Sequence, residues 1–123
     1  MCRMIFATGK FNTDWLIDDM IQMALDQNEK HEENARKVFK HEDGWGVCYL
    51  EDNQLKIIRS VKAFFADPQV DELRKIQTPL FILHTRHASK GKVDIHNVHP
   101  FEYRNEHSHY VFFHNGTIED NLS

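Results

Sequence analysis

The hydrophobic and polar positions at the front of the chain predict a strand followed by a helix. Residues Arg3–Thr8 form a short strand-like run that ends at Gly9. Asn12 or Thr13 is suited to cap the next segment, where apolar residues recur at helical spacing. These residues are Leu16, Ile17, Met20, Ile21 and Ala24. We therefore expect an amphipathic helix over one face of a sheet, and then a charged, solvent-exposed stretch from 26 to 40.

The middle of the chain predicts a β-hairpin. One strand ends at Leu50, a polar turn follows, and Gln54–Arg59 returns as the second strand. Gly44 and Gly46 flank Trp45 at the start of the hairpin. Two interpretations of these glycines stay open: another group approaches the backbone closely, or the segment is a plain turn with a core tryptophan.

The second half of the chain predicts one short helix and two buried strands. Asp67 as the N-cap, with Pro68 in the first turn, favours a helix to about Lys75. The run Pro79–His84 is continuously apolar up to its last residue and has the length of a fully buried strand. The segment His109–His114 has the same character.

Length and charge narrow the class of protein. The chain has 123 residues, which fit a single domain over 1–123 with one core. Its formal net charge is -4, and the basic residues are scattered, so we expect no nucleic-acid partner. No apolar run approaches the roughly 18 residues that span a bilayer, and the front of the chain lacks a positively charged region followed by an apolar one. We expect a cytoplasmic protein that does not contact a membrane.

The two cysteines, Cys2 and Cys48, differ in their setting. Cys48 lies within a strand pattern and is expected to be a small buried residue. Cys2 becomes the first residue once Met1 is removed, and it then carries both a thiol and a free α-amine. An α-amine titrates near neutral pH, so it can take the thiol proton and act as the base of a nucleophilic reaction.

Polar groups suited to acyl transfer lie where the predicted strands begin or end. Cys2 precedes the first strand, and Arg86 follows the strand that ends at His84. Asn115 and Gly116 follow the strand that ends at His114. A guanidinium binds a carboxylate in a bidentate manner, and an amide side chain beside a glycine N–H can stabilise an oxyanion.

Five sequence blocks, in order and spacing, resemble the class II glutamine amidotransferase domain of the N-terminal-nucleophile (Ntn) hydrolase superfamily, closest to its stand-alone members. The blocks are Met1-Cys2-Arg3, His41-Glu42-Asp43-Gly44-Trp45-Gly46, His84-Thr85-Arg86-His87-Ala88-Ser89-Lys90-Gly91, Asn97-Val98-His99-Pro100-Phe101 and Phe113-His114-Asn115-Gly116-Thr117-Ile118. The resemblance implies an α+β fold, a four-layer αββα sandwich of two antiparallel sheets that is incomplete at its C-terminal end.

The resemblance also implies an activity and a site. The expected reaction is hydrolysis of the γ-amide of glutamine or of a γ-glutamyl compound through a Cys2 thioester, without a cofactor or metal. Cys2 is the implied nucleophile, and Asn115 and Gly116 are the implied oxyanion hole. Arg86 is implied to hold the substrate α-carboxylate. The pocket is implied to be lined by His87, Ser89 and His99. A synthase that receives the ammonia is an implied partner.

The chain departs from the family pattern in two respects. His87 and Ser89 stand where the familiar motif has tryptophan and threonine, so an imidazole that titrates near neutral pH is expected at the pocket wall. The chain also ends at Ser123, where the family domain continues, and offers no acidic residue after Gly116 suited to the substrate amine. We expect either a fragment of a longer protein or a compact relative, and an exposed sheet edge that favours self-association.

Two other functions fit parts of the sequence. A metal-binding module could use His84, His87, His96 and His99, although their spacing matches no common set of zinc ligands. A non-catalytic ligand-sensing or subunit-contact domain of the same fold is expected if Met1 is retained, because the α-amine is then an amide.

Overall fold

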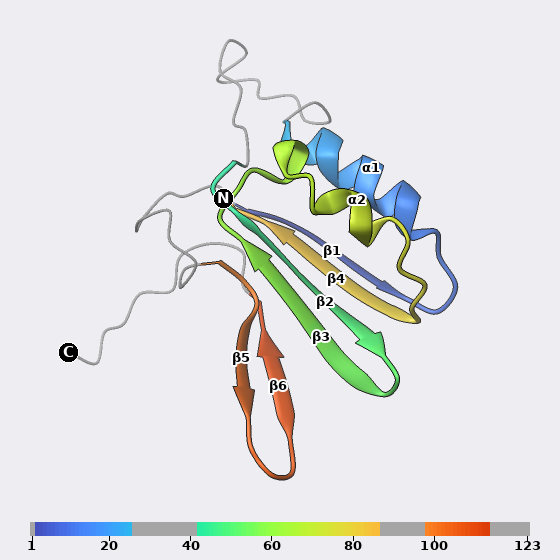
Figure 1. The fold of residues 1–123 in the computed structure, drawn as a ribbon, viewed down its shortest axis with the longest axis vertical. Coiled ribbons are helices and arrows are strands. Elements are labelled where there is room, and N and C mark those ends of the chain that lie inside the picture. The colour runs from blue at the N-terminus through green and yellow to red at the C-terminus, as the bar shows by residue number, and fades with distance from the viewer. Residues whose placement is uncertain (1, 26–41, 87–97, 114–123) are drawn as a thin grey trace, which may run out of the picture.

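The computed structural model describes residues 2–25, 42–86 and 98–113, which form two antiparallel sheets and two α-helices (Figure 1). The larger sheet, sheet A, has the strand order β1-β4-β2-β3. Its strands are β1 (Arg3–Thr8), β2 (Trp45–Glu51), β3 (Gln54–Ser60) and β4 (Leu80–Thr85). The second sheet pairs β5 (Phe101–Arg104) with β6 (His109–Phe112). The predicted α+β class is confirmed, while the four-layer sandwich stays a prediction.

Strand β4 is an inner strand of sheet A and lies between β1 and β2. It is antiparallel to both β1 and β2, so that Leu83 lies opposite Ile5 on one side and Val47 on the other. From Phe81 to Thr85 every residue is buried. A strand with neighbours on both sides and cover on both faces needs no polar face, and the prediction of a buried strand is confirmed with a shift of one residue.

Helix α1 (Thr13–Ala24) covers one face of sheet A together with the short helix α2 (Val70–Leu73) (Figure 1). Asn12 caps α1, because its side-chain oxygen accepts a hydrogen bond from the Trp15 backbone N–H at 3.2 Å. The predicted helix is confirmed. The residues that α1 buries in the core are Ile17, Met20 and Ala24, whereas the Trp15 side chain is 70% exposed.

The hydrophobic core lies between these helices and sheet A. Its fully buried aromatic residues include Trp45 and Phe64, whose rings meet edge to face with centroids 5.6 Å apart. A 3₁₀ turn over Phe64–Ala66, which the sequence pattern did not predict, carries Phe64 into this core. The other core residues are Ile17, Met20, Val47, Val70, Leu73, Phe81 and Leu83.

Asp67 connects the core residue Trp45 to the residues that precede α2 through hydrogen bonds. One carboxylate oxygen accepts hydrogen bonds from Trp45 Nε1 at 2.9 Å and from Ser60 Oγ at 2.7 Å. The other accepts the Gln69 backbone N–H at 3.0 Å. Burial alone would raise the pKa of the Asp67 carboxyl, but these hydrogen bonds and the Lys62 charge together lower it.

The predicted helix from Pro68 to Lys75 is too long. Helix α2 covers only Val70–Leu73. Beyond it, the backbone N–H groups of Lys75 and Ile76 donate to the carbonyls of Glu72 and Leu73, three residues earlier instead of four. The segment therefore tightens into 3₁₀-type turns, which seldom extend far.

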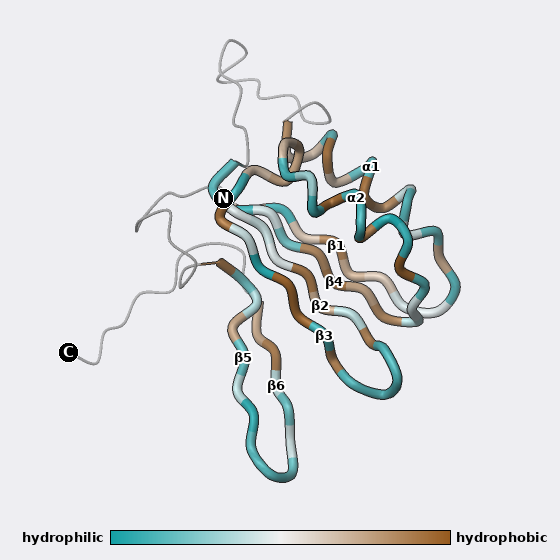
Figure 2. Tube along the Cα trace, viewed as in Figure 1, coloured by the Kyte–Doolittle hydropathy of each residue, from teal (hydrophilic) through white to brown (hydrophobic). Residues whose placement is uncertain are grey.

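The β2–β3 hairpin turns through Asp52 and Asn53, which have φ values of 52° and 62°. Two consecutive residues with positive φ give the hairpin turn whose twist matches that of the flanking strands. The predicted hairpin is confirmed. The tips of this hairpin and of the β5–β6 hairpin are both hydrophilic (Figure 2).

The β5–β6 hairpin corrects the prediction of a buried strand over His109–His114. Strand β6 ends at Phe112, and His114 lies outside the described residues. The side chains of Tyr110 and Phe112 are 60% and 51% exposed. They are exposed because β6 pairs only with β5 in the described part of the chain, and this hairpin diverges from sheet A (Figure 1).

None of the described helices has the length and apolar character needed to cross a membrane.

Strand β1 is an edge of sheet A within the described part of the chain, and its Met4 and Phe6 side chains are 43% and 63% exposed. Self-association through such an edge stays a prediction.

Candidate active site

Cys2 and Arg86 lie at the same end of two neighbouring strands. The register of β1 and β4 pairs Arg3 with Thr85, so Cys2 and Arg86 each lie one residue beyond the last pair of this ladder. Both residues are buried, with 7% of their surface exposed. The predicted nucleophile and the predicted carboxylate-binding residue therefore lie at the same end of sheet A.

Side-chain alternation places these two residues on the face of sheet A that is turned away from the helices. Thr85 belongs to the helix-covered face, where its hydroxyl lies 3.4 Å from Met20 Sδ of α1. Its neighbour Arg86 is on the opposite face, as is His84. Cys2 shares that face because it is two residues from Met4, the register partner of His84.

The backbone of Arg86 is held on both of its hydrogen-bonding groups. Its N–H donates to the Gly44 carbonyl at 2.8 Å, and its carbonyl accepts the Asp43 N–H at 3.0 Å. These bonds continue the β4–β2 ladder past the end of β4. Arg86 is therefore fixed in position before the chain enters 87–97, which lies outside the described residues.

The two glycines that flank Trp45 allow the segment from Val98 to Pro100 to lie directly on β2. A Cβ on Gly46 would overlap the His99 carbonyl oxygen and would lie 2.9 Å from Cδ of Pro100. Gly44 has a φ of 118°, and a Cβ there would lie 2.8 Å from Val98 Cγ2. The first interpretation is confirmed, and the group that approaches the backbone is the chain itself. Of the second, only the core tryptophan is confirmed, because Trp45 is fully buried but begins strand β2 instead of lying in a turn.

His99 reaches the same face of sheet A and meets His84. His99 Nδ1 lies 2.8 Å from His84 Nε2, and the ring centroids are 4.1 Å apart at an interplanar angle of 80°. His84 is completely buried, and His99 is 3% exposed. His99 was a predicted pocket residue; His84 was considered only as a metal ligand. The signal for His84 was its position two residues before Arg86, which puts both on one face of sheet A.

The remaining predicted site residues fall outside the described residues. These are His87, Ser89, Asn115 and Gly116. Their roles in the pocket and in the oxyanion hole stay predictions, as does the expected lack of an acidic partner for the substrate amine.

Cys48 has the environment of an unreactive thiol. It is completely buried on β2. Burial raises the pKa of its thiol to about 11, with a smaller contribution from the negative charge of Glu102. The thiolate is the reactive form of cysteine, so Cys48 is almost entirely in the unreactive form at neutral pH. The prediction of a buried structural cysteine is confirmed.

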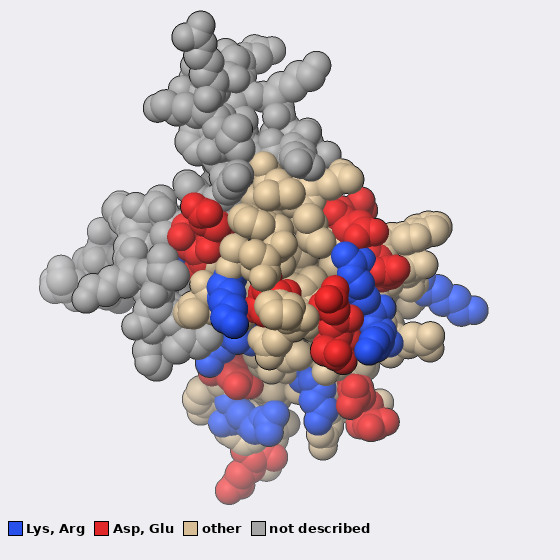
Figure 3. Space-filling view, turned by 45° about the horizontal axis from the view of Figure 1, so that its top comes forward, with Lys and Arg blue, Asp and Glu red and all other residues tan. Residues whose placement is uncertain are grey.

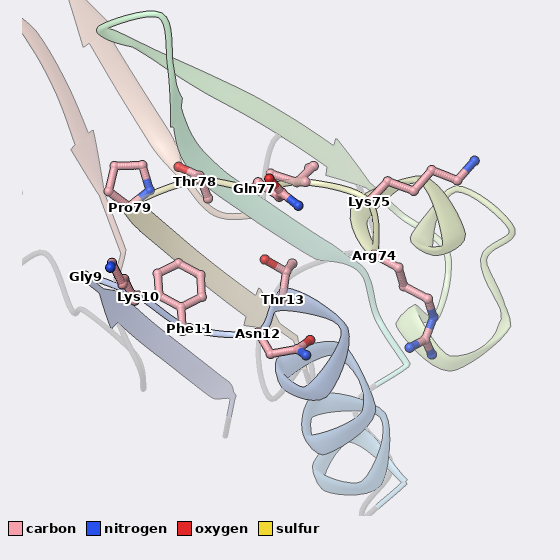
Figure 4. A pocket seen from close by; sticks show the side chains of 11 residues that line it. Gly9, Lys10, Phe11, Asn12, Thr13, Arg74, Lys75, Gln77, Thr78 and Pro79 are labelled. Atoms are coloured by element: carbon pink, nitrogen blue, oxygen red, sulfur yellow. The ribbon is translucent and has the colours of Figure 1, made fainter.

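A cleft of about 780 Å³ opens at the other end of sheet A, between the residues that follow β1 and those that precede β4 (Figure 4). Arg74 lines this cleft, but its guanidinium forms ion pairs with Asp14 and with Asp18, the latter at 2.8 Å. The hydrogen bond to Asp14 is the main reason why the pKa of Arg74 is raised. Lys75 points outward in the same view (Figure 4). The cleft therefore lacks convergent charge and is separate from Cys2.

Surface charge and possible metal ligands bear on nucleic-acid binding and on the metal-binding alternative. Acidic and basic side chains are interspersed over the face seen in Figure 3, which shows no extended patch of one sign. Within 2–25, 42–86 and 98–113, no group of three or more His, Cys, Asp or Glu side chains could hold one metal ion. Of the four histidines considered as metal ligands, His84 and His99 meet, whereas His87 and His96 lie outside those ranges.

Comparison with known proteins identifies the family. A family model described as "Glutamine amidotransferases class-II" matches residues 15–123. A Haemophilus influenzae protein named "Putative glutamine amidotransferase" is 33% identical over 82 residues, which cover 65% of this chain and 28% of that protein. An Escherichia coli protein named "Putative glutamine amidotransferase YafJ" is 26% identical over 80 residues, which cover 63% of this chain and 31% of that protein.

The matched part thus spans less than a third of either relative. The family match itself covers residues 15–123, which include Arg86 and His99 but not Cys2. This extent, together with the resemblance of the sequence blocks, establishes the family: the chain belongs to the class II glutamine amidotransferases.

Proposed function

We propose that this chain carries glutaminase activity, in which Cys2 attacks the side-chain amide of glutamine or of a γ-glutamyl compound. The observation that carries the proposal is the β1–β4 register, which brings Cys2 next to Arg86 at one end of sheet A. The family match begins at residue 15, so this register is what links Cys2 to the part of the chain that the family model covers.

The proposed reaction begins when the α-amine of Cys2, freed by removal of Met1, takes the thiol proton. The thiolate adds to the amide carbon, and the resulting oxyanion is stabilised by the Asn115 side-chain amide and the Gly116 N–H. The tetrahedral intermediate collapses, the C–N bond breaks, and the ammonium of Cys2 gives its proton to the leaving nitrogen. Ammonia is released, and the acyl group remains bound to Cys2 as a thioester. Water then hydrolyses the thioester to the γ-carboxylate and the free thiol.

Arg86 is proposed to select the substrate by its α-carboxylate. Its backbone is fixed by Gly44 and Asp43, and its side chain is on the same face as Cys2. A guanidinium in a fixed position can bind both oxygens of a carboxylate, which a lysine ammonium cannot do in the same geometry. The amide group of a bound glutamine is thereby directed toward the thiol.

The test compares the two cysteines. In the full chain, Cys2→Ala should abolish ammonia release from L-glutamine and labelling by 6-diazo-5-oxo-L-norleucine, a glutamine mimic that alkylates nucleophilic thiols. Cys48→Ala is the matched control and should keep both, because Cys48 is buried with a raised pKa. An intact-mass spectrum of the labelled protein also reports whether Met1 has been removed. Undiminished labelling of Cys2→Ala would refute the proposal, and binding of glutamine without turnover would favour a ligand-sensing domain.

The role of Arg86 has a separate test. Arg86→Lys should raise KM for L-glutamine about 10-fold or more, because the bidentate contact is lost. It should have little effect on 4-aminobutanamide, which lacks the α-carboxylate. Equal effects on both substrates would show that Arg86 does not recognise that group.

The proposal also includes the complete architecture of the domain and the use of the released ammonia. We infer a four-layer αββα sandwich, since the helices cover one face of sheet A and a second antiparallel sheet follows in sequence. The released ammonia is proposed either to leave as product or to be used by a synthase.

A further inference from the structure

His84 is an unusual residue for the inner strand of a sheet. It is completely buried, with Met4 of β1 on one side and Gly46 of β2 on the other. An imidazole in such a place is unfavourable unless its nitrogens form hydrogen bonds. The neighbour that provides one is His99, whose Nδ1 lies 2.8 Å from His84 Nε2.

The two imidazoles restrain each other. A hydrogen bond between two ring nitrogens needs one donor and one acceptor, so at least one of the two rings is neutral and both have a defined orientation. The rings also meet edge to face, at 80°. Fixing the His99 ring in this way fixes a residue that is proposed to line the glutamine pocket.

The contacts of His84 extend to the segment that leads to the proposed oxyanion hole. Its ring centroid is 6.1 Å from that of Phe113, two residues before Asn115. The His99 ring in turn lies 4.7 Å from the Phe101 ring and 6.4 Å from the Phe113 ring. A single side chain on β4 is therefore in contact with the two segments that meet on this face of sheet A.

From this geometry we propose that His84 is a positioning residue of the glutaminase site. It does not touch the substrate; it holds His99 by a hydrogen bond and Phe113 by ring packing, and so fixes the pocket wall and the approach to the oxyanion hole relative to Cys2. The inference rests on the proposed function. It assigns to His84 an effect on the chemical step, whereas recognition of the α-carboxylate belongs to Arg86.

The test uses variants that differ in hydrogen bonding. His84→Phe keeps a flat ring but cannot bond to His99, whereas His84→Gln places an amide nitrogen near the position of Nε2. We expect His84→Phe to lower kcat for L-glutamine about 100-fold, the scale associated with displacement of a site by about 1 Å, and to change KM less than about threefold. His84→Gln should recover most of the lost kcat.

A double variant tests whether His84 acts through His99. If it does, His84→Phe combined with His99→Phe should reduce kcat no more than the stronger single variant, because both remove the same hydrogen bond. Additive losses, or equal losses in the Phe and Gln variants, would overturn the proposal. So would a loss of kcat that disappears when the rate is expressed per site labelled by 6-diazo-5-oxo-L-norleucine, since that reports only a smaller folded fraction.

The same samples separate this inference from the proposed function. If the unmodified protein shows neither labelling at Cys2 nor ammonia release, the proposed function fails, and the inference that rests on it fails with it. If labelling and turnover are present but insensitive to His84→Phe, only the inference fails. Imidazole ¹⁵N resonances provide a readout independent of activity: the His99 Nδ1 resonance should shift on His84→Phe and return toward its original position with His84→Gln.

Discussion

The two faces of sheet A differ in what they contain, and strand β4 shows the difference residue by residue. On the face under the helices it presents Phe81 and Leu83 to the hydrophobic core. On the other face it presents His84, and Arg86 follows directly after its last residue, at the same end of the sheet as Cys2. Because side chains alternate along a strand, one six-residue segment contributes both to the core and to the candidate site.

The polar groups of the two faces are accommodated in different ways. On the helix face the buried Asp67 carboxylate accepts hydrogen bonds from three donors. On the other face the polar residues contact segments that arrive from far along the sequence, as His99 contacts His84. We therefore expect changes on the helix face to alter stability, and changes on the other face to alter activity.

The largest expected effect on stability comes from Leu83→Ala. Leu83 is completely buried in the core, and removal of a buried leucine side chain typically lowers the free energy of unfolding by about 2–5 kcal/mol. The measurement is denaturant unfolding monitored by circular dichroism. Turnover per site labelled at Cys2 should stay close to that of the unmodified protein; a parallel fall in turnover would break the distinction between the two faces.

Gly46→Ala should mainly affect activity. A Cβ at this position overlaps the His99 carbonyl, so the segment from Val98 to Pro100 must move away from β2. We expect kcat/KM for L-glutamine to fall about 100-fold, the scale seen when a site is displaced by about 1 Å.

The matched control for this change is Gly9→Ala at the far end of β1. Gly9 has a positive φ, 87°, which Gly46 does not have, and an added Cβ at Gly9 meets no atom within 4 Å. This variant should lose some stability through backbone strain and keep its turnover. If both glycine variants lose turnover equally, the close approach at Gly46 is not what matters.

A smaller effect is expected from Asp67→Asn, in the range of about 1–3 kcal/mol, because the charged acceptor of three hydrogen bonds is replaced. The lowered pKa of Asp67 means that its charge stabilises the folded state above the ordinary carboxyl pKa of 3.8. That contribution is lost as the pH falls below this value, through the lower pKa of the folded protein.

Chemical denaturation at pH 7 and near pH 3 measures this contribution. The difference in stability between the unmodified protein and Asp67→Asn should shrink at the lower pH. A difference that stays constant would mean that the charge of Asp67 is not what stabilises the fold.

Local patterns predicted those elements whose signals lie within a few residues. The spacing of apolar residues after Asn12 was enough for α1, and the polar turn at Asp52 and Asn53 was enough for the β2–β3 hairpin. Helix α2 was overestimated, because an N-cap and a proline indicate where a helix begins but not where it tightens into 3₁₀ turns.

Contacts between distant parts of the chain could not be predicted in the same way. The apolar run of β6 looked buried, since the sequence does not show that its only described strand partner is β5. The pairing of His84 with His99 joins residues 15 apart. For the site, the sequence indicated Cys2 and Arg86 at strand ends, but only the β1–β4 register shows that those ends are adjacent.

The contrast between Trp45 and Trp15 gives the protein a built-in optical reporter. These are its two tryptophans; one is sealed in the core with its indole N–H on a carboxylate, and the other is 70% exposed on α1. Acrylamide should quench the emission of Trp15 and spare that of Trp45. With Trp15→Phe, a single tryptophan remains, between the two glycines on which the segment from Val98 to Pro100 rests. Its emission, excited at about 295 nm where tyrosine absorbs little, can follow ligand binding at the neighbouring site in real time.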